Sequence, residues 1–185
     1  MLGTHPRRGS VHPLVPLPTA ATGAERLRSG LTFAVAGDPM TGAVVTSLGG
    51  RVVTVEDPDR ASYHAAASIA ANHMVALIGQ VERVAASAGL PLDAFAHLMR
   101  AALDDAVDLG PRRALTGPAA RGDWDTVDRH RRALSTLPGS RTELAAYDAM
   151  VGLARRLTME SEPPAVPADP AALGAVAAVA EERVA

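Results

Sequence analysis

The chain has 185 residues, of which 48% are hydrophobic and 21% charged, with a formal net charge of −2 and no cysteine. This length is enough for one substantial globular domain, and the balanced charge argues against nucleic acid as a partner. Without cysteine the chain has no disulfides, thiolate nucleophiles or thiolate metal ligands. All 18 basic residues are arginine, which excludes any mechanism that depends on a lysine.

Residues 1–30 are predicted to be mostly loop, because four prolines fall between positions 6 and 18. A short polar helix is expected within residues 21–30. The prolines also interrupt any apolar stretch of signal-peptide length, so we expect a cytoplasmic protein. Residues 61–81 carry no full charge, but they hold too many polar side chains for a membrane span.

A compact strand, helix and strand follow. Residues 31–37 read as a buried strand, residues 38–50 as a capped helix with a glycine stop, and residues 51–56 as a second strand. Such a unit is best satisfied by parallel pairing with the helix on one face. Two strands do not make a stable sheet on their own, so we expect a further strand from upstream or from a partner chain.

One long helix is predicted over residues 57–89. Asp57 and Pro58 are typical of a helix start, and Gly89 is typical of a helix end. The helix is apolar on nearly all sides until position 82, which predicts burial against several neighbours. We expect a homodimer that forms through this helix.

More helices are expected toward the carboxyl terminus: residues 91–109, residues 123–137, and residues 140–160 with Ser140 and Glu143 as a capping box. A loop is expected between the first two. Residues 161–185 read as a proline-rich linker and a short terminal helix. The predicted domains are therefore 1–56, 57–160 and the tail 161–185.

Four stretches together resemble one family: GSVHPL (9–14), TFAVAGDP (32–39), GGRVVTVEDPDRASYHAAASIAANH (49–73) and ALTGPAARGD (114–123). They are similar to an uncharacterised bacterial oxidoreductase family in which a Rossmann-like domain precedes a helical domain of unknown function. That helical domain resembles the carboxy-terminal domain of 6-phosphogluconate dehydrogenase. The resemblance covers residues 9 to about 158.

The resemblance implies an α/β remnant of a Rossmann-like sheet followed by a mainly α-helical domain. Relatives of the family include ketopantoate reductase and pyrroline-5-carboxylate reductase, which implies reduction of a small keto acid or imine with NADP or NAD. The GxGxxG loop that holds a dinucleotide pyrophosphate is absent from this sequence. We therefore expect a chain that starts partway through the Rossmann-like domain, and the alternative is an association module that binds no cofactor.

His64, Ser68 and Asn72 recur at a spacing of four and should line one groove of the long helix. In such a reductase a proton must reach the carbonyl oxygen, and the imidazole of His64 is the candidate donor. Asn72 can orient the carbonyl, and Ser68 is a substrate-binding candidate. The alternative interpretation is that His64 and Asn72 bind loop backbone at a domain seam, and for Ser68 the structural role is favoured.

Three other residues are candidates outside this helix. His12 is expected on a loop facing the cofactor cleft, with a turn histidine held by Pro13 as the alternative. Thr116 and Arg121 belong to the LTGPAARGD loop, where the guanidinium can fork onto a substrate carboxylate or a phosphate. A purely structural turn is the alternative, in which Asp123 caps the next helix. No metal-ligand spacing is found, and no metal is expected.

Overall fold

The computed structural model describes residues 7–160, which form two compact units that divide between Arg83 and Val84. The division falls inside the long helix, whereas the predicted domain boundary at 56–57 lies between the end of the sheet region and the start of that helix. The predicted tail at 161–185 lies outside the described residues. Among residues 7–160, each helix is too short or too polar to cross a bilayer.

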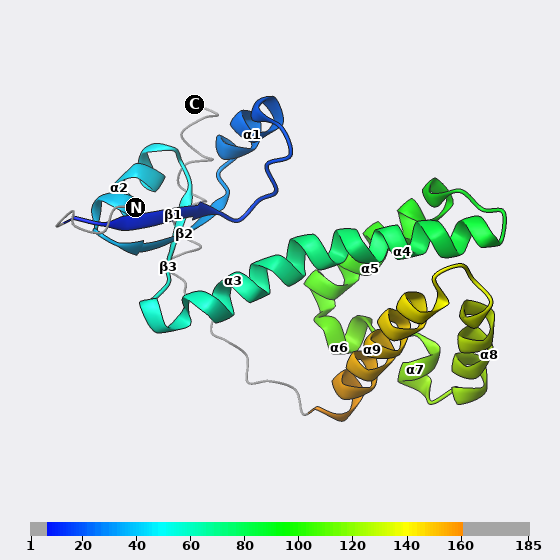
Figure 1. Ribbon diagram of the computed structural model, residues 1–185. Coiled ribbons are helices and arrows are strands. Elements are labelled where there is room, and N and C mark those ends of the chain that lie inside the picture. The colour runs from blue at the N-terminus through cyan, green and yellow to red at the C-terminus, as the bar shows by residue number, and fades with distance from the viewer. Residues whose placement is uncertain (1–6, 161–185) are drawn as a thin grey trace, which may run out of the picture. The chain divides into compact units, whose positions relative to one another are not determined.

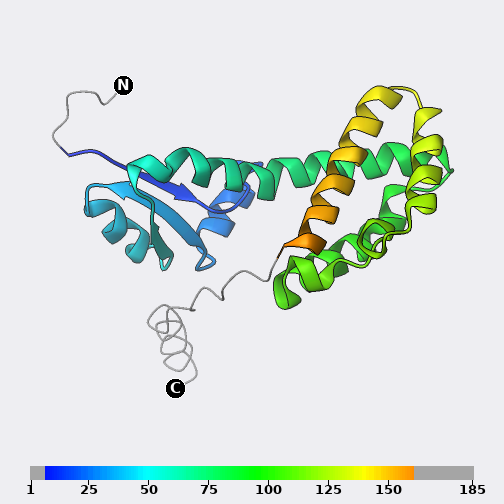
Figure 2. The same cartoon turned by 90° about the horizontal axis from the view of Figure 1, so that it is seen from below.

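The first unit contains a mixed sheet of three strands in the order β1-β2-β3 (Figure 1). The central strand β2 pairs antiparallel with β1 and parallel with β3. The helix α2 lies on one side of this sheet and α3 on the other (Figure 2). The strands and helices of this part are β1 (Gly9–Pro13), α1 (Ala20–Leu27), β2 (Thr32–Gly37), α2 (Met40–Ser47) and β3 (Arg51–Thr54).

The predicted strand, helix and strand are confirmed with slightly shorter bounds, and so is the parallel pairing. Their core is the contact of Phe33 and Val35 on β2 with Val45 on α2, all of them buried. Alternate residues of a strand face opposite sides of the sheet, so these two β2 side chains share the side that α2 covers. Burial of these three side chains supplies the main apolar stabilisation of the sheet.

The prediction that residues 1–30 are loop is wrong for β1, although the short helix α1 is confirmed. Strand β1 runs from Gly9, opposite Gly37, to Pro13, opposite Phe33. It is an edge strand, where a proline is tolerated because its missing N–H would face solvent. Local propensity opposes a strand here, and the pairing with β2, distant in sequence, decides the outcome. This strand supplies the third member that the two predicted strands needed.

The long helix forms as predicted from residue 57 onward, with departures from α geometry at its start and its middle. It opens with a 3-10 turn, and a π turn interrupts it at residues 69–73. The expected burial on all sides is wrong within the described chain, because Ala85 is its one buried residue. Its segments are the 3-10 turn Asp57–Asp59, α3 (Arg60–Ser68), the π turn Ile69–His73 and α4 (Met74–Ser87).

The second unit is helical, as predicted. Helix α8 starts at the side chain of Asp123, which accepts a hydrogen bond from the backbone N–H of Thr126. The capping box expected at Ser140 is wrong, because Ser140 is already helical and Gly139 occupies the cap position at φ +74°. The loop expected before α8 contains two short helices. The elements are a 3-10 turn (Leu92–Phe95), α5 (Ala96–Leu109), α6 (Pro111–Ala114), α7 (Pro118–Arg121), α8 (Trp124–Ser135) and α9 (Ser140–Met159).

Candidate functional site

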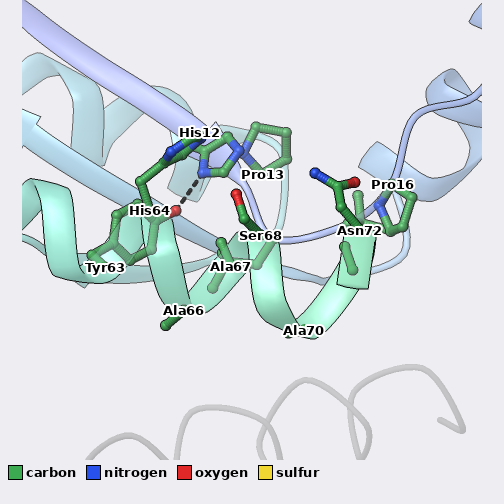
Figure 3. Close-up of a pocket in the computed structure, with 13 residues that line it drawn as sticks. His12, Pro13, Pro16, Tyr63, His64, Ala66, Ala67, Ser68, Ala70 and Asn72 are labelled. Atoms are coloured by element: carbon green, nitrogen blue, oxygen red, sulfur yellow. Dashed lines mark hydrogen bonds between the residues drawn. The ribbon is translucent and has the colours of Figure 1, made fainter. Parts of the chain in front are cut away.

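The predicted polar line of the long helix borders a cavity of about 600 Å³ in the first unit. His64, Ser68 and Asn72 point to one side of the helix, toward the segment that contains Pro13 and Pro16 (Figure 3). His12 closes the same cavity from β1. The full lining is His12, Pro13, Leu14, Val15, Pro16, Tyr63, His64, Ala66, Ala67, Ser68, Ala70, Ala71 and Asn72.

The π turn keeps the three polar side chains in line. In a regular α-helix each step of four residues drifts by about 40°, so Asn72 would turn away from His64. A π turn has more residues per turn, so each residue rotates by a smaller angle about the helix axis. Asn72 lies inside the π turn Ile69–His73. The local departure from α geometry therefore offsets the drift between Ser68 and Asn72. Such π turns are frequent at functional sites.

Alanine fills the positions between the polar groups. Ala66, Ala67, Ala70 and Ala71 all line the cavity, and their methyl groups leave the space that larger side chains would occupy. Alanine also has the highest helix propensity, so the helix keeps its backbone while presenting a shallow surface. The alanine-rich composition thus produces an open apolar floor beside a row of hydrogen-bonding groups.

A histidine and tyrosine pair connects the strand to the helix. The imidazole Nδ1 of His12 shares a hydrogen bond with the hydroxyl of Tyr63 (Figure 3), and the two rings meet edge to face with centroids 5.8 Å apart. The ring of His64 lies 6.1 Å from that of His12. Burial raises the pKa of Tyr63, so its hydroxyl stays protonated at neutral pH and is available as a donor.

Tyr63 was not among the site residues expected from the sequence, and His12 was expected on a loop. His12 in fact lies on β1, where it pairs with Ala34. The sequence signal for Tyr63 was its spacing: it precedes His64 by one residue and lies nine residues before Asn72, on the helical face that continues through positions 67 and 71. A tyrosine among alanines on the face next to the polar line is the feature that would have revealed it.

Thr116 and Arg121 lie in the second unit and do not line this cavity. The guanidinium of Arg121 donates to the backbone carbonyl of Thr116, across the turn that precedes α7. This contact is the structural role weighed for the loop. Binding of substrate by either residue stays a prediction. Among residues 7–160 there is no cluster of three metal-ligating side chains.

The comparisons agree with this architecture. The chain belongs to the family defined by a domain of unknown function, DUF2520, whose model matches residues 32–153. No curated protein sequence matches the chain. The resemblance drawn from the sequence motifs is thereby confirmed at the level of a family with a domain of unknown function.

Two solved structures share the fold. Protein TM1727 from Thermotoga maritima is 28% identical, with a TM-score of 0.65, over 82% of this chain and 62% of that one. A protein from Bacteroides fragilis, BF3122, entitled "putative NADP oxidoreductase", is 20% identical with a TM-score of 0.68, over 84% of this chain and 60% of that one. The chain thus spans about six tenths of the length of the structures it matches, and the fold is a small mixed sheet followed by a mainly helical region.

Proposed function

We propose that this chain forms the substrate-binding and proton-donating part of an NAD(P)-dependent oxidoreductase that reduces a small keto acid or an imine. The observation that carries the proposal is the cavity of about 600 Å³ that collects His12, His64, Ser68 and Asn72. Its volume lies in the range of small-molecule sites. The similarity to a structure named a "putative NADP oxidoreductase" supports the reaction class. The kinship with ketopantoate reductase and 6-phosphogluconate dehydrogenase belongs to the same proposal.

His64 is the proposed proton donor. An imidazole can act as a general acid that releases its proton to a carbonyl oxygen or an imine nitrogen as the hydride arrives at carbon. The amide of Asn72 can donate to the same ligand further along the cavity, and the hydroxyl of Ser68 lies between them in the row. Leu14 and the alanine floor would contact the apolar part of the substrate.

The described residues do not fit the phosphate half of a dinucleotide. No arginine lines the larger cavity, the sequence contains no lysine, and residues 7–160 hold no glycine-rich turn of the GxGxxG type. A nicotinamide supplies a hydride when it is bound. The cofactor is therefore proposed from resemblance alone, and the roles assigned to this chain are substrate binding and proton transfer.

Turnover tests the proposal. Because the described residues do not fit the dinucleotide phosphates, the assay uses a fusion in which the nucleotide-binding part of a longer family member precedes this chain. We expect the fusion to oxidise NADPH in the presence of α-keto acids, and we expect His64→Ala to lower its kcat about a hundredfold or more, as loss of a general acid does. His73→Ala is the matched control, because His73 is an exposed histidine of the same helix that lines neither cavity. Absence of keto-acid-dependent oxidation, or an unchanged kcat in His64→Ala, would contradict the proposal.

A second candidate function is a non-catalytic association module, whose occupant is a second copy of this chain. Exposed apolar side chains recur along this segment of the long helix, at Ile69 (57% exposed), Met74, Val75 (68% exposed) and Leu77, and apolar surface of this kind is typical of interaction sites. Residues 61–81 carry no full charge, so two copies could pack along this segment without burying an ion. Both copies would present the same surface, as a two-fold interface requires.

Light scattering coupled to size exclusion distinguishes this candidate. We expect a dimer, and we expect Val75→Asp to yield monomers because it buries a charge in the interface. Val107→Asp is the control, since Val107 is equally exposed at 75% but lies on α5. A monomeric wild-type chain would exclude the module, and a dimer that shows no heat of α-keto acid binding in calorimetry would favour it over the reductase.

A further inference from the structure

A second cavity of about 380 Å³ adjoins the first. His12, Tyr63 and His64 line both cavities, so the histidine and tyrosine cluster stands between two spaces. The lining of the second cavity is Ser10, His12, Ala34, Val35, Ala36, Val55, Arg60, Ala61, Tyr63 and His64.

The second cavity has space because β2 carries small side chains, Ala34 and Ala36, on this face of the sheet. Ser10 pairs with Ala36, and His12 pairs with Ala34, and residues directly opposite one another share a face of the sheet. On this face β2 carries alanines, whereas its other face carries Phe33 and packs on α2. The alternation along β2 thus assigns its large residues to the core and its alanines to the cavity.

Arg60 gives the second cavity a positive charge. Among the described residues that line the two cavities, Arg60 alone carries a full charge at neutral pH, and no carboxylate accompanies it in either lining. A guanidinium nitrogen of Arg60 lies 3.3 Å from a carboxylate oxygen of Asp57. This ion pair is exposed, because the side chain of Arg60 is 53% and that of Asp57 87% accessible. Pairs of this kind contribute little, and a guanidinium has five N–H donors, so Arg60 can receive another anion.

The spacing of Arg60 and His64 suits one small ligand. They lie four residues apart on α3, the separation at which side chains on a helix are neighbours. The carboxylate and the carbonyl of an α-keto acid are directly bonded. A ligand of this class can therefore place its carboxylate on Arg60 and its carbonyl oxygen at His64, while its alkyl part enters the larger cavity.

We propose that the second cavity is the carboxylate site of the substrate, with Arg60 as the anion-binding residue, and that the substrate is an α-keto acid. This inference rests on the proposed function and specifies its substrate class. It assigns recognition of the carboxylate to the first unit, to a residue that was not among the site residues expected from the sequence.

An NMR titration without cofactor tests the inference, following the imidazole resonances of His12 and His64. The probes are α-ketoisovalerate and methyl isopropyl ketone, which has a methyl group in place of the carboxylate. We expect Arg60→Gln to weaken binding of the keto acid roughly tenfold to a hundredfold, the usual effect of losing a charged hydrogen bond, and to leave the ketone unaffected. Asp57→Asn should tighten keto-acid binding about twofold, because it removes a competing anion.

Arg51→Gln is the matched control, because Arg51 donates to the Thr32 hydroxyl and lines neither cavity. Keto-acid binding that is unchanged in Arg60→Gln would overturn the carboxylate site and leave the proposed reductase intact. Binding of inorganic phosphate through Arg60 more tightly than the keto acid would overturn the assignment in favour of a phosphate site. Absence of keto-acid binding by the wild-type chain would overturn both the site and the proposed function.

Discussion

The Nδ1 atom of His12 and the hydroxyl of Tyr63 share a hydrogen bond that joins the edge strand β1 to the first turns of α3. The two residues are 51 positions apart in the sequence, and their rings meet at 82°. A hydrogen bond at one ring nitrogen fixes which nitrogen of a neutral imidazole carries the proton. With the Tyr63 hydroxyl as donor, the Nε2 atom of His12 keeps the proton.

Tyr63→Phe removes that hydroxyl while keeping the ring. We expect a loss of about 1 kcal/mol in the free energy of unfolding, the typical contribution of one hydrogen bond. We also expect the NMR resonances of the His12 ring nitrogens to shift toward the mixture of tautomers found in a free imidazole. Chemical denaturation and NMR measure the two effects.

Tyr147→Phe is the control for this variant. Tyr147 on α9 bonds to the Nδ1 atom of His130 at 2.8 Å, with the rings again edge to face at 83°, but this pair lies in the second unit and outside both cavities. It should lower stability by a similar amount and leave keto-acid binding unchanged. If Tyr63→Phe and Tyr147→Phe changed keto-acid binding equally, the hydrogen bond between His12 and Tyr63 would not contribute specifically to the site.

Gly37 tests the junction between β1 and β2. Its φ is +83°, and a Cβ atom at this position would lie 2.3 Å from the carbonyl oxygen of Arg8. We expect Gly37→Ala to cost roughly 2 kcal/mol or more in unfolding free energy, from left-handed strain and the backbone clash. Gly42→Ala is the control, because Gly42 lies in α2 with open space around it, and alanine should there stabilise by about 0.5–1 kcal/mol. Denaturant unfolding that ranked the two variants in the opposite order would contradict this account.

Elements with a strong local pattern were predictable from the sequence. Apolar composition predicts the buried strand at 32–37. The pair Asp57-Pro58 predicts the start of the long helix, because proline is favoured in the first turn of a helix. Strand β1 was not predictable in this way, because its residues GSVHP are poor strand formers and it forms through pairing with β2. The π turn at 69–73 likewise has no recognised signature in the alanine-rich sequence.

The candidate site shows the same division. The line of His64, Ser68 and Asn72 follows from helical spacing alone, and the structure places all three around one cavity. The partner of that line is β1, so missing the strand meant placing His12 on a loop and overlooking Tyr63 and Arg60, whose relevance depends on what faces them. Spacing identifies residues on one element, whereas a site between elements needs the pairing of distant segments.

Asp123 gives a prediction for the second unit that depends on pH. Hydrogen bonds from the hydroxyl and then the backbone N–H of Thr126 lower the pKa of Asp123. A carboxyl group whose pKa is lower in the folded state stabilises the fold above its unfolded pKa, and this contribution is lost as the pH falls through the folded value. Asp123→Ala should therefore lower the melting temperature by a few degrees at pH 7, since an N-cap is lost, and by less under strongly acidic conditions.

Asp123→Asn separates the cap from the charge. Asparagine is as good an N-cap as aspartate, so this variant should keep most of the stability at pH 7 while losing the pH dependence that Asp123 contributes. Thermal unfolding followed by circular dichroism at neutral and acidic pH measures both effects. An Asp123→Ala variant that melts with the wild type at pH 7 would show that α8 starts independently of this side chain, and the hydrogen bond to the backbone N–H of Thr126 at 3.1 Å would then carry no stability.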